Sequence, residues 1–173
     1  MDLRFPAGQF QKADSYSEDE RARFIAEIEE TPARLRAAVE GLTAEQLEAP
    51  YRPDGWTVRQ VAHHLPDSHM NGYSRMKMAL TEDEPTIKTY FEDRWAQLAD
   101  TRTVPVEVSL ALLEALHERW VTIWRSLTPA EFTRKFKHPD FGALTLEQHL
   151  ALYAWHGRHH VAHITSLRER MGW

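Results

Sequence analysis

Histidines that could bind a metal ion are concentrated near the end of the chain. The chain has ten histidines in 173 residues, so a segment of eight residues should hold about half of one, yet 156–163 (HGRHHVAH) holds four. Side chains four residues apart on a helix share a face, with Cβ atoms about 5–6 Å apart. His156 and His160 form such a pair. At about 100° per residue, His163 falls on the same face.

A second group of histidines occupies 63–69 (HHLPDSH), on a separate predicted helix. Within it, His64 adjoins the apolar side of the helix and is the best candidate to point inward. Pro66 removes a backbone hydrogen bond from the carbonyl of Ala62, which predicts a bend beside this group. Such a bend could aim an imidazole across the fold.

Two histidines from the later segment and one from the earlier segment would form a three-nitrogen site. That ligand set is typical of catalytic zinc, with an open fourth position for water or substrate. The chain has no cysteine, which excludes thiolate zinc sites, cysteine nucleophiles and disulfide scaffolds. Imidazole ligands favour Zn, Ni, Fe, Mn or Co over soft copper chemistry. The alternative is that these histidines cap carbonyls, pair with acids or line a dimer face, and the clustering favours the metal.

Four long amphipathic helices must position these groups. Helix-start signals stand at Ser17, Thr57 and Thr145, each followed three residues later by Glu or Gln, and another helix begins after Pro105. Pro32 predicts a kink or a break in the first of these helices near residue 31. Shorter helices are predicted at 43–46 and around 92–98, and the segment 135–144 is predicted to be a loop.

Strand-like alternation and hairpin dipeptides are missing, so the sequence predicts an all-α four-helix bundle. We expect a single domain over 1–173, with an extended arm at 1–16. The fragments 42–47 and 127–132 resemble each other and favour two related helical hairpins.

The charge balance, 21 basic against 26 acidic residues, argues against nucleic acid or an anionic membrane as the main partner. No stretch of about 18 apolar residues is present, and the N-terminal residues do not have the pattern of a secretory signal. We expect a soluble, cytoplasmic protein.

The two histidine segments resemble a known family. The segments 55–71 (GWTVRQVAHHLPDSHMN) and 153–164 (YAWHGRHHVAHI) are similar to the two metal motifs of the DinB superfamily, specifically its YfiT-like branch of metal-dependent hydrolases. The segments 5–8, 109–113 and 170–173 also fit this branch, so the resemblance covers nearly the whole chain.

The resemblance implies a four-helix bundle, a homodimer, and one divalent metal per chain bound by His64, His156 and His160. Zinc is the expected metal and nickel the alternative. His163 then takes a position where many relatives carry a polar residue that does not bind the metal, although the helical spacing alone leaves it open as a ligand. Pro66 departs from the branch, where a helix-compatible residue is more usual.

The candidate site does not contain the His-Glu-x-x-His arrangement, because Gly157 stands where a metallopeptidase places its catalytic glutamate. Asp67 could orient His64 or accept a proton. Arg75 and Arg158 could bind an anionic substrate. We assign no catalytic residue from the sequence, and aromatic residues are assigned to the core, including Trp56, Trp120, Trp124, Phe132 and Trp155.

We therefore expect a metal-dependent hydrolase that acts on a small molecule, with neither nucleic acid nor membrane as a partner. One alternative is an S-transferase using a low-molecular-weight thiol such as bacillithiol, mycothiol or glutathione, as other DinB-like proteins are. Three neutral histidines without a glutamate suit that chemistry, because a metal-bound thiol is already a thiolate. A second alternative is a metal-binding dimeric bundle without turnover.

Overall fold

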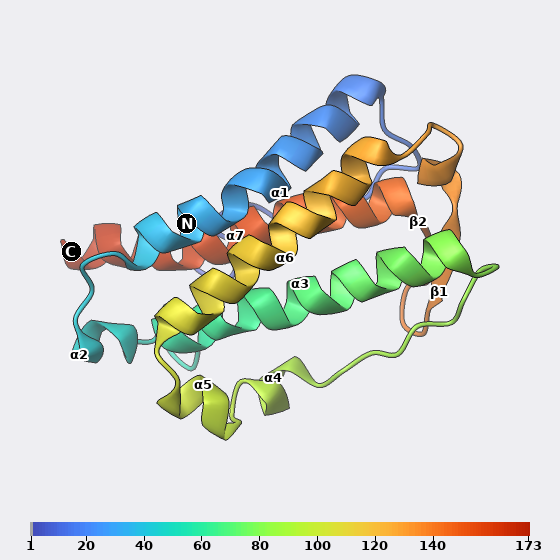
Figure 1. Ribbon diagram of the computed structural model, residues 1–173. Coiled ribbons are helices and arrows are strands. Elements are labelled where there is room, and N and C mark those ends of the chain that lie inside the picture. Colours follow the sequence, from blue (N-terminus) through green and yellow to red (C-terminus); the bar gives the residue numbers. More distant parts are fainter. Residues whose placement is uncertain (1) are drawn as a thin grey trace.

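Four long helices form the body of the computed structural model, which describes residues 2–173 (Figure 1). They are α1 (Glu18–Val39), α3 (Val58–Thr81), α6 (Val106–Ser126) and α7 (Leu146–Met171). Both α1 and α3 pack against α6 and α7. The helices α1 and α3 therefore lie diagonally across the bundle, as do α6 and α7. The predicted four-helix bundle is confirmed, but its halves are not hairpins of adjacent helices.

The predicted helix starts are present as reciprocal caps. Ser17, Thr43, Thr57 and Thr145 each accept a hydrogen bond from the backbone N–H three residues on, whose side chain accepts one in return. These caps satisfy backbone donors that have no partner inside a helix, and so they set where α1, α2 (Ala44–Leu47), α3 and α7 begin.

Of the predicted kink or break at Pro32, the break is not present, because α1 continues through this residue. Proline has no N–H, and it therefore leaves the carbonyl of Ile28 without its helical partner. The Nδ1 atom of His117 in α6 lies 2.6 Å from that carbonyl oxygen. A side chain from a neighbouring helix thus replaces the missing backbone donor.

The segment 135–144 forms a hairpin, so the predicted loop is wrong. Strands β1 (Lys135–His138) and β2 (Gly142–Thr145) pair antiparallel, with Lys135 opposite Thr145. Each short strand buries one large apolar residue, Phe136 or Leu144, which is too brief an alternation to see in the sequence. Around the hairpin and along the α3–α6 connection lie short helices: α4 (Glu92–Trp95), within the predicted 92–98 range, α5 (Ala99–Thr103) and the 3-10 turn η1 (Glu131–Thr133).

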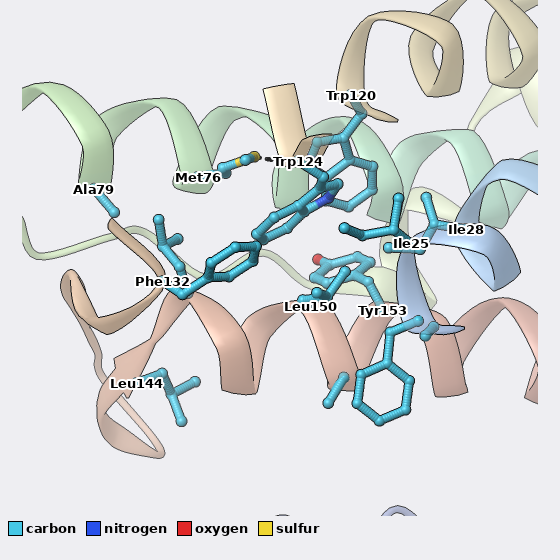
Figure 2. Close-up of a cluster of buried hydrophobic side chains, with 14 of the residues drawn as sticks. Ile25, Ile28, Met76, Ala79, Trp120, Trp124, Phe132, Leu144, Leu150 and Tyr153 are labelled. Carbon is cyan, nitrogen blue, oxygen red and sulfur yellow. Dashed lines mark hydrogen bonds between the residues drawn. The ribbon is translucent and has the colours of Figure 1, made fainter. Parts of the chain in front are cut away.

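Two apolar clusters fill the bundle, one at each end. The cluster near the hairpin is aromatic and includes Trp120, Trp124, Phe132 and Tyr153 (Figure 2). The other is aliphatic and includes Leu35, Leu65, Leu113 and Ile164. Between the two clusters, buried histidines interrupt three of the helices: His69 on α3, His117 on α6, and His159, His160 and His163 on α7. The fold therefore holds a polar layer across its middle.

The N-terminal segment 2–16 has neither helix nor strand and lies along α7. The Trp155 indole donates to the carbonyl of Gly8 at 2.9 Å, and the Gln148 amide donates to that of Ala13 at 3.0 Å. Met1, which belongs to the predicted arm, lies outside the described residues. Over residues 2–173, none of the helices combines the length and the apolar character that a bilayer crossing requires.

Candidate metal centre

His64, His156 and His160 meet in the polar layer. One ring nitrogen from each lies within 4.8 Å of the other two. The Nε2 atoms of His64 and His156 are 3.3 Å apart. Nitrogens at about 2.0–2.1 Å from one tetrahedral ion are about 3.3–3.4 Å apart, so this pair has the spacing that a single cation needs.

The helices explain this convergence. His156 and His160 are four residues apart on α7 and share a face, and α3 packs against α7 and carries His64. Helix α3 runs through Pro66 without interruption. The structure thus brings together the three residues that the family resemblance implied.

Burial keeps the three imidazoles neutral. It lowers the pKa of His64 to about 4 and the pKa values of His156 and His160 well below the usual value, and neighbouring histidines lower them further. At neutral pH each ring therefore carries one proton and one lone pair. That is the form in which imidazole binds a metal.

The three histidines line a cavity of about 560 Å³, which also reaches Tyr51, Ser68, Arg75 and Tyr90. Trp56, assigned to the core from the sequence, packs against the aliphatic cluster and also forms part of the cavity wall. Its ring is 4.7 Å from that of His64 and 6.3 Å from that of His160, and its indole N–H donates to Asp93. It directly precedes the α3 cap and lies outside any helical stripe, so no periodicity could have assigned it. Trp120, Trp124 and Phe132 are buried in the aromatic cluster, as predicted.

The charged residues considered from the sequence have different positions. Arg75 lines the cavity, whereas Arg158 forms an ion pair with Glu27 of α1. Burial, together with Asp100, raises the pKa of Asp67 to about 6. Within residues 2–173, no hydrogen bond joins the Asp67 carboxylate to His64, so the suggested orienting contact is not found.

Gly157 faces away from the cavity. A Cβ atom at this position would lie 2.6 Å from Oγ1 of Thr31 in α1. The position that holds the glutamate in metallopeptidases is therefore closed by helix packing, and an acid there would not face the three histidines.

A second histidine group shares one member with the first. Ring nitrogens of His159, His160 and His163 also lie within 4.8 Å of one another. All three residues come from α7, and His163 donates from Nε2 to the carbonyl of Arg4 at 3.1 Å. Its ring stacks on Tyr51 with centroids 3.9 Å apart. His163 therefore reaches the cavity wall with one nitrogen already used by the backbone.

Sequence reasoning missed two histidines next to the site. His69 Nε2 lies 3.0 Å from His156 Nδ1, and His69 Nδ1 lies 2.7 Å from His117 Nε2. His117 comes from α6, and no local spacing links it to the other two. The sequence feature that points to a buried role for His117 is Pro32, because this proline leaves the Ile28 carbonyl, which His117 contacts, without its helical donor.

The fold and this site define a four-helix bundle protein with a three-histidine candidate metal centre at a cavity. The sequence model of the DinB superfamily matches residues 27–164. The chain belongs to the DinB superfamily.

Individual relatives agree with this assignment. The chain is 52% identical over 172 residues to the Bacillus mycoides protein named "Putative metal-dependent hydrolase BcerKBAB4_2443", covering 99% of both chains. A Bacillus cereus protein, "Putative metal-dependent hydrolase BCAH820_2714", is equally similar, at 52% identity with 99% of both chains covered.

Two solved structures share the fold. YfiT from Bacillus subtilis, described as "a probable metal-dependent hydrolase with an unusual four-helix bundle topology", superposes with a TM-score of 0.97 at 49% identity, covering 100% of this chain and 99% of YfiT. The four-helix bundle protein TT2238 has a TM-score of 0.56 at 20% identity, over 82% and 94% of the two chains, and supports the fold alone. The predicted family, its YfiT-like branch and the bundle are confirmed.

Proposed function

We propose that this protein is a metal-dependent hydrolase of small molecules, with one divalent cation bound by His64, His156 and His160. Zinc is the expected ion, and nickel is the alternative for the same ligands. The observation that carries the proposal is the 3.3 Å approach of two neutral Nε2 atoms, from two helices, at the wall of a cavity. Three protein ligands leave a coordination position for substrate on the cavity side.

A cation held there would supply Lewis-acid chemistry, polarising a substrate oxygen or lowering the pKa of a water or a thiol. The chain's own residues position and enclose the reacting groups. Trp56 packs against two of the histidines, and Ser68 Oγ lies 3.4 Å from His156 Nε2. Arg75 offers a positive charge on the cavity wall for an anionic part of the substrate.

A metal-dependent S-transferase using a low-molecular-weight thiol such as bacillithiol is the second candidate. The specific observation is that His64, His156 and His160 contact one another, Trp56, Ser68 and other histidines, with no carboxylate among their hydrogen-bond partners in residues 2–173. The acids that line the cavity, Asp54, Glu92 and Asp93, form no hydrogen bond to the three histidines within residues 2–173. Hydrolysis normally requires a base within hydrogen-bond reach, whereas a thiol attacks as a preformed thiolate.

Zinc titration of matched variants tests the ligand assignment. His64 belongs only to the first histidine group and His163 only to the second. We expect isothermal titration calorimetry to find one zinc per chain in the wild type and in His163→Ala, and stoichiometric binding to be abolished in His64→Ala and His160→Ala. Zinc binding that survives in His64→Ala and is lost in His163→Ala would contradict the assignment and favour the second group.

Turnover separates the candidate reactions. The zinc-loaded protein is incubated with ester and amide substrates, and separately with an electrophile and each candidate thiol. Hydrolysis above the uncatalysed rate supports the first candidate, and thiol-dependent conjugation supports the second. Stoichiometric zinc without either rate would favour a non-catalytic metal-binding bundle. The homodimer stays a prediction, which sedimentation equilibrium would test.

A further inference from the structure

A chain of three hydrogen bonds connects His156 to the backbone on the far side of the bundle. His156 Nδ1 lies 3.0 Å from His69 Nε2, and His69 Nδ1 lies 2.7 Å from His117 Nε2. His117 Nδ1 lies 2.6 Å from the carbonyl oxygen of Ile28. His69 and His117 are almost completely inaccessible to solvent, at 0% and 2% exposure. This hydrogen-bonded series, His156–His69–His117–Ile28 carbonyl, is called the relay, and it crosses the bundle from α7 through α3 and α6 to α1.

The last acceptor exists because of Pro32. In an uninterrupted helix, the carbonyl of Ile28 would accept from the N–H of residue 32, which proline does not have. A buried carbonyl without a partner is costly, so it strongly favours a donor from another element. His117 supplies that donor.

This fixed end determines where each proton lies. A carbonyl only accepts, so His117 must carry its proton on Nδ1, and its Nε2 must accept. His69 must then donate from Nδ1 and accept at Nε2, and His156 must in turn donate from Nδ1. Each of the three contacts takes one proton, because a pair of atoms 2.6–3.0 Å apart forms a hydrogen bond only when one proton lies between them, and three contacts therefore give the three rings one proton each.

We propose that His69 and His117 are positioning residues that, anchored on the Ile28 carbonyl, hold His156 as the Nδ1–H tautomer with its Nε2 lone pair directed at the metal centre. The consequence for metal binding rests on the proposed function, whereas the tautomers do not. Other ligating histidines are usually oriented by a carboxylate, a carbonyl or a water. Here two further imidazoles carry that role across the bundle.

The relay belongs to His156 alone among the three candidate ligands. The Nδ1 atom of His160 is buried and has no hydrogen-bond partner in residues 2–173. Loss of the relay should therefore disturb the His156 ring and leave the orientation of the other two candidate ligands to packing.

Ring-nitrogen NMR of the metal-free protein tests the tautomers directly. In the ¹⁵N-labelled wild type, long-range ¹H–¹⁵N correlations should show His69, His117 and His156 all protonated at Nδ1. An Nε2–H tautomer at any of the three would overturn the proposal. This readout requires no bound metal, so it stands even if the protein binds no zinc and the proposed function fails.

Zinc affinity of matched variants tests the consequence. His117→Leu should weaken zinc binding about 10- to 100-fold, the usual loss for an orienting partner, and should abolish the single tautomer of His156. His149→Leu is the control, because His149 is equally buried and bonds to a backbone carbonyl, that of Gly72, outside the relay. His117→Gln keeps an acceptor for His69 and should restore most of the affinity.

Equal affinities of His117→Leu and His149→Leu would overturn the proposal. If His117→Leu does not fold, the comparison rests on His117→Gln. That variant should retain the Nδ1–H tautomer of His69 and bind zinc within a few-fold of wild type, and a His69 tautomer on Nε2 would equally overturn the proposal.

Discussion

The close contact of α1 and α7 at Gly157 gives a sharp test of the packing beside the site. A Cβ atom on residue 157 would lie 2.6 Å from Thr31 Oγ1 and 2.9 Å from Thr31 Cγ2, distances that real Cβ atoms do not adopt. The Thr31 hydroxyl is held by a hydrogen bond to the carbonyl of Glu27 at 2.8 Å. Gly157→Ala must therefore separate the two helices or rotate Thr31 away from that bond.

Two opposing contributions determine how much Gly157→Ala should change the free energy of unfolding. Replacing a helical glycine by alanine gains about 1 kcal/mol of helix propensity. Overpacking of a tight contact costs about 1–3 kcal/mol. Gly157→Ala should therefore change the free energy of unfolding by between about 0 and −2 kcal/mol. Thr31→Ala removes both clashing atoms, so the same glycine substitution in that background should instead be stabilising by up to about 1 kcal/mol.

Urea unfolding of the wild type, both single variants and the double variant forms a complete cycle. The Thr31 hydrogen bond is lost both in the Thr31→Ala single variant and in the double variant, so its contribution cancels in the cycle. The coupling energy should therefore be about 1–3 kcal/mol in favour of the double variant. Additive effects within about 0.5 kcal/mol, or a Gly157→Ala variant more stable than wild type, would refute the packing argument.

Three further predictions concern stability. Burial lowers the pKa of His149 to about 3. Below about pH 6.5 the unfolded chain therefore binds a proton at this residue that the folded chain does not bind. As the pH falls, the unfolding free energy of the metal-free protein decreases by about 1.4 kcal/mol per pH unit for each such histidine. Urea unfolding at about pH 6 and pH 5 should show a slope that is smaller by this amount in His149→Leu. Gly72→Ala, inside α3, places a Cβ atom 2.5 Å from the Tyr153 ring. An overpacking cost of about 1–3 kcal/mol, offset by about 1 kcal/mol of helix propensity, should lower the unfolding free energy by up to about 2 kcal/mol in the same assay. Zinc at 100 times its dissociation constant should raise the unfolding free energy of the wild type by about 2.7 kcal/mol, and equal stabilisation of His160→Ala would contradict the ligand assignment.

Much of the fold was readable because its signals are local. Each of the Ser17, Thr57 and Thr145 caps lies within four residues of the helix that it starts, and an amphipathic stripe repeats along one helix. The hairpin at 135–145 was missed because its stability comes from Phe136 and Leu144 packing on the bundle, which no short window contains. The sequence also did not show which of the four long helices are neighbours in the bundle, because adjacent and diagonal helices have the same local patterns.

The sequence by itself excluded thiolate chemistry from the protein's own side chains, because it has no cysteine, and it favoured an imidazole site, because histidines stand four residues apart on one predicted helix. It also placed Pro32, whose missing N–H leaves a carbonyl in need of a donor. Only the tertiary structure decided that His64 meets His156, that Trp56 joins the wall, and that His69 and His117 connect the site to that carbonyl. The physical reason is that ring orientation and burial depend on contacts between helices far apart in the chain.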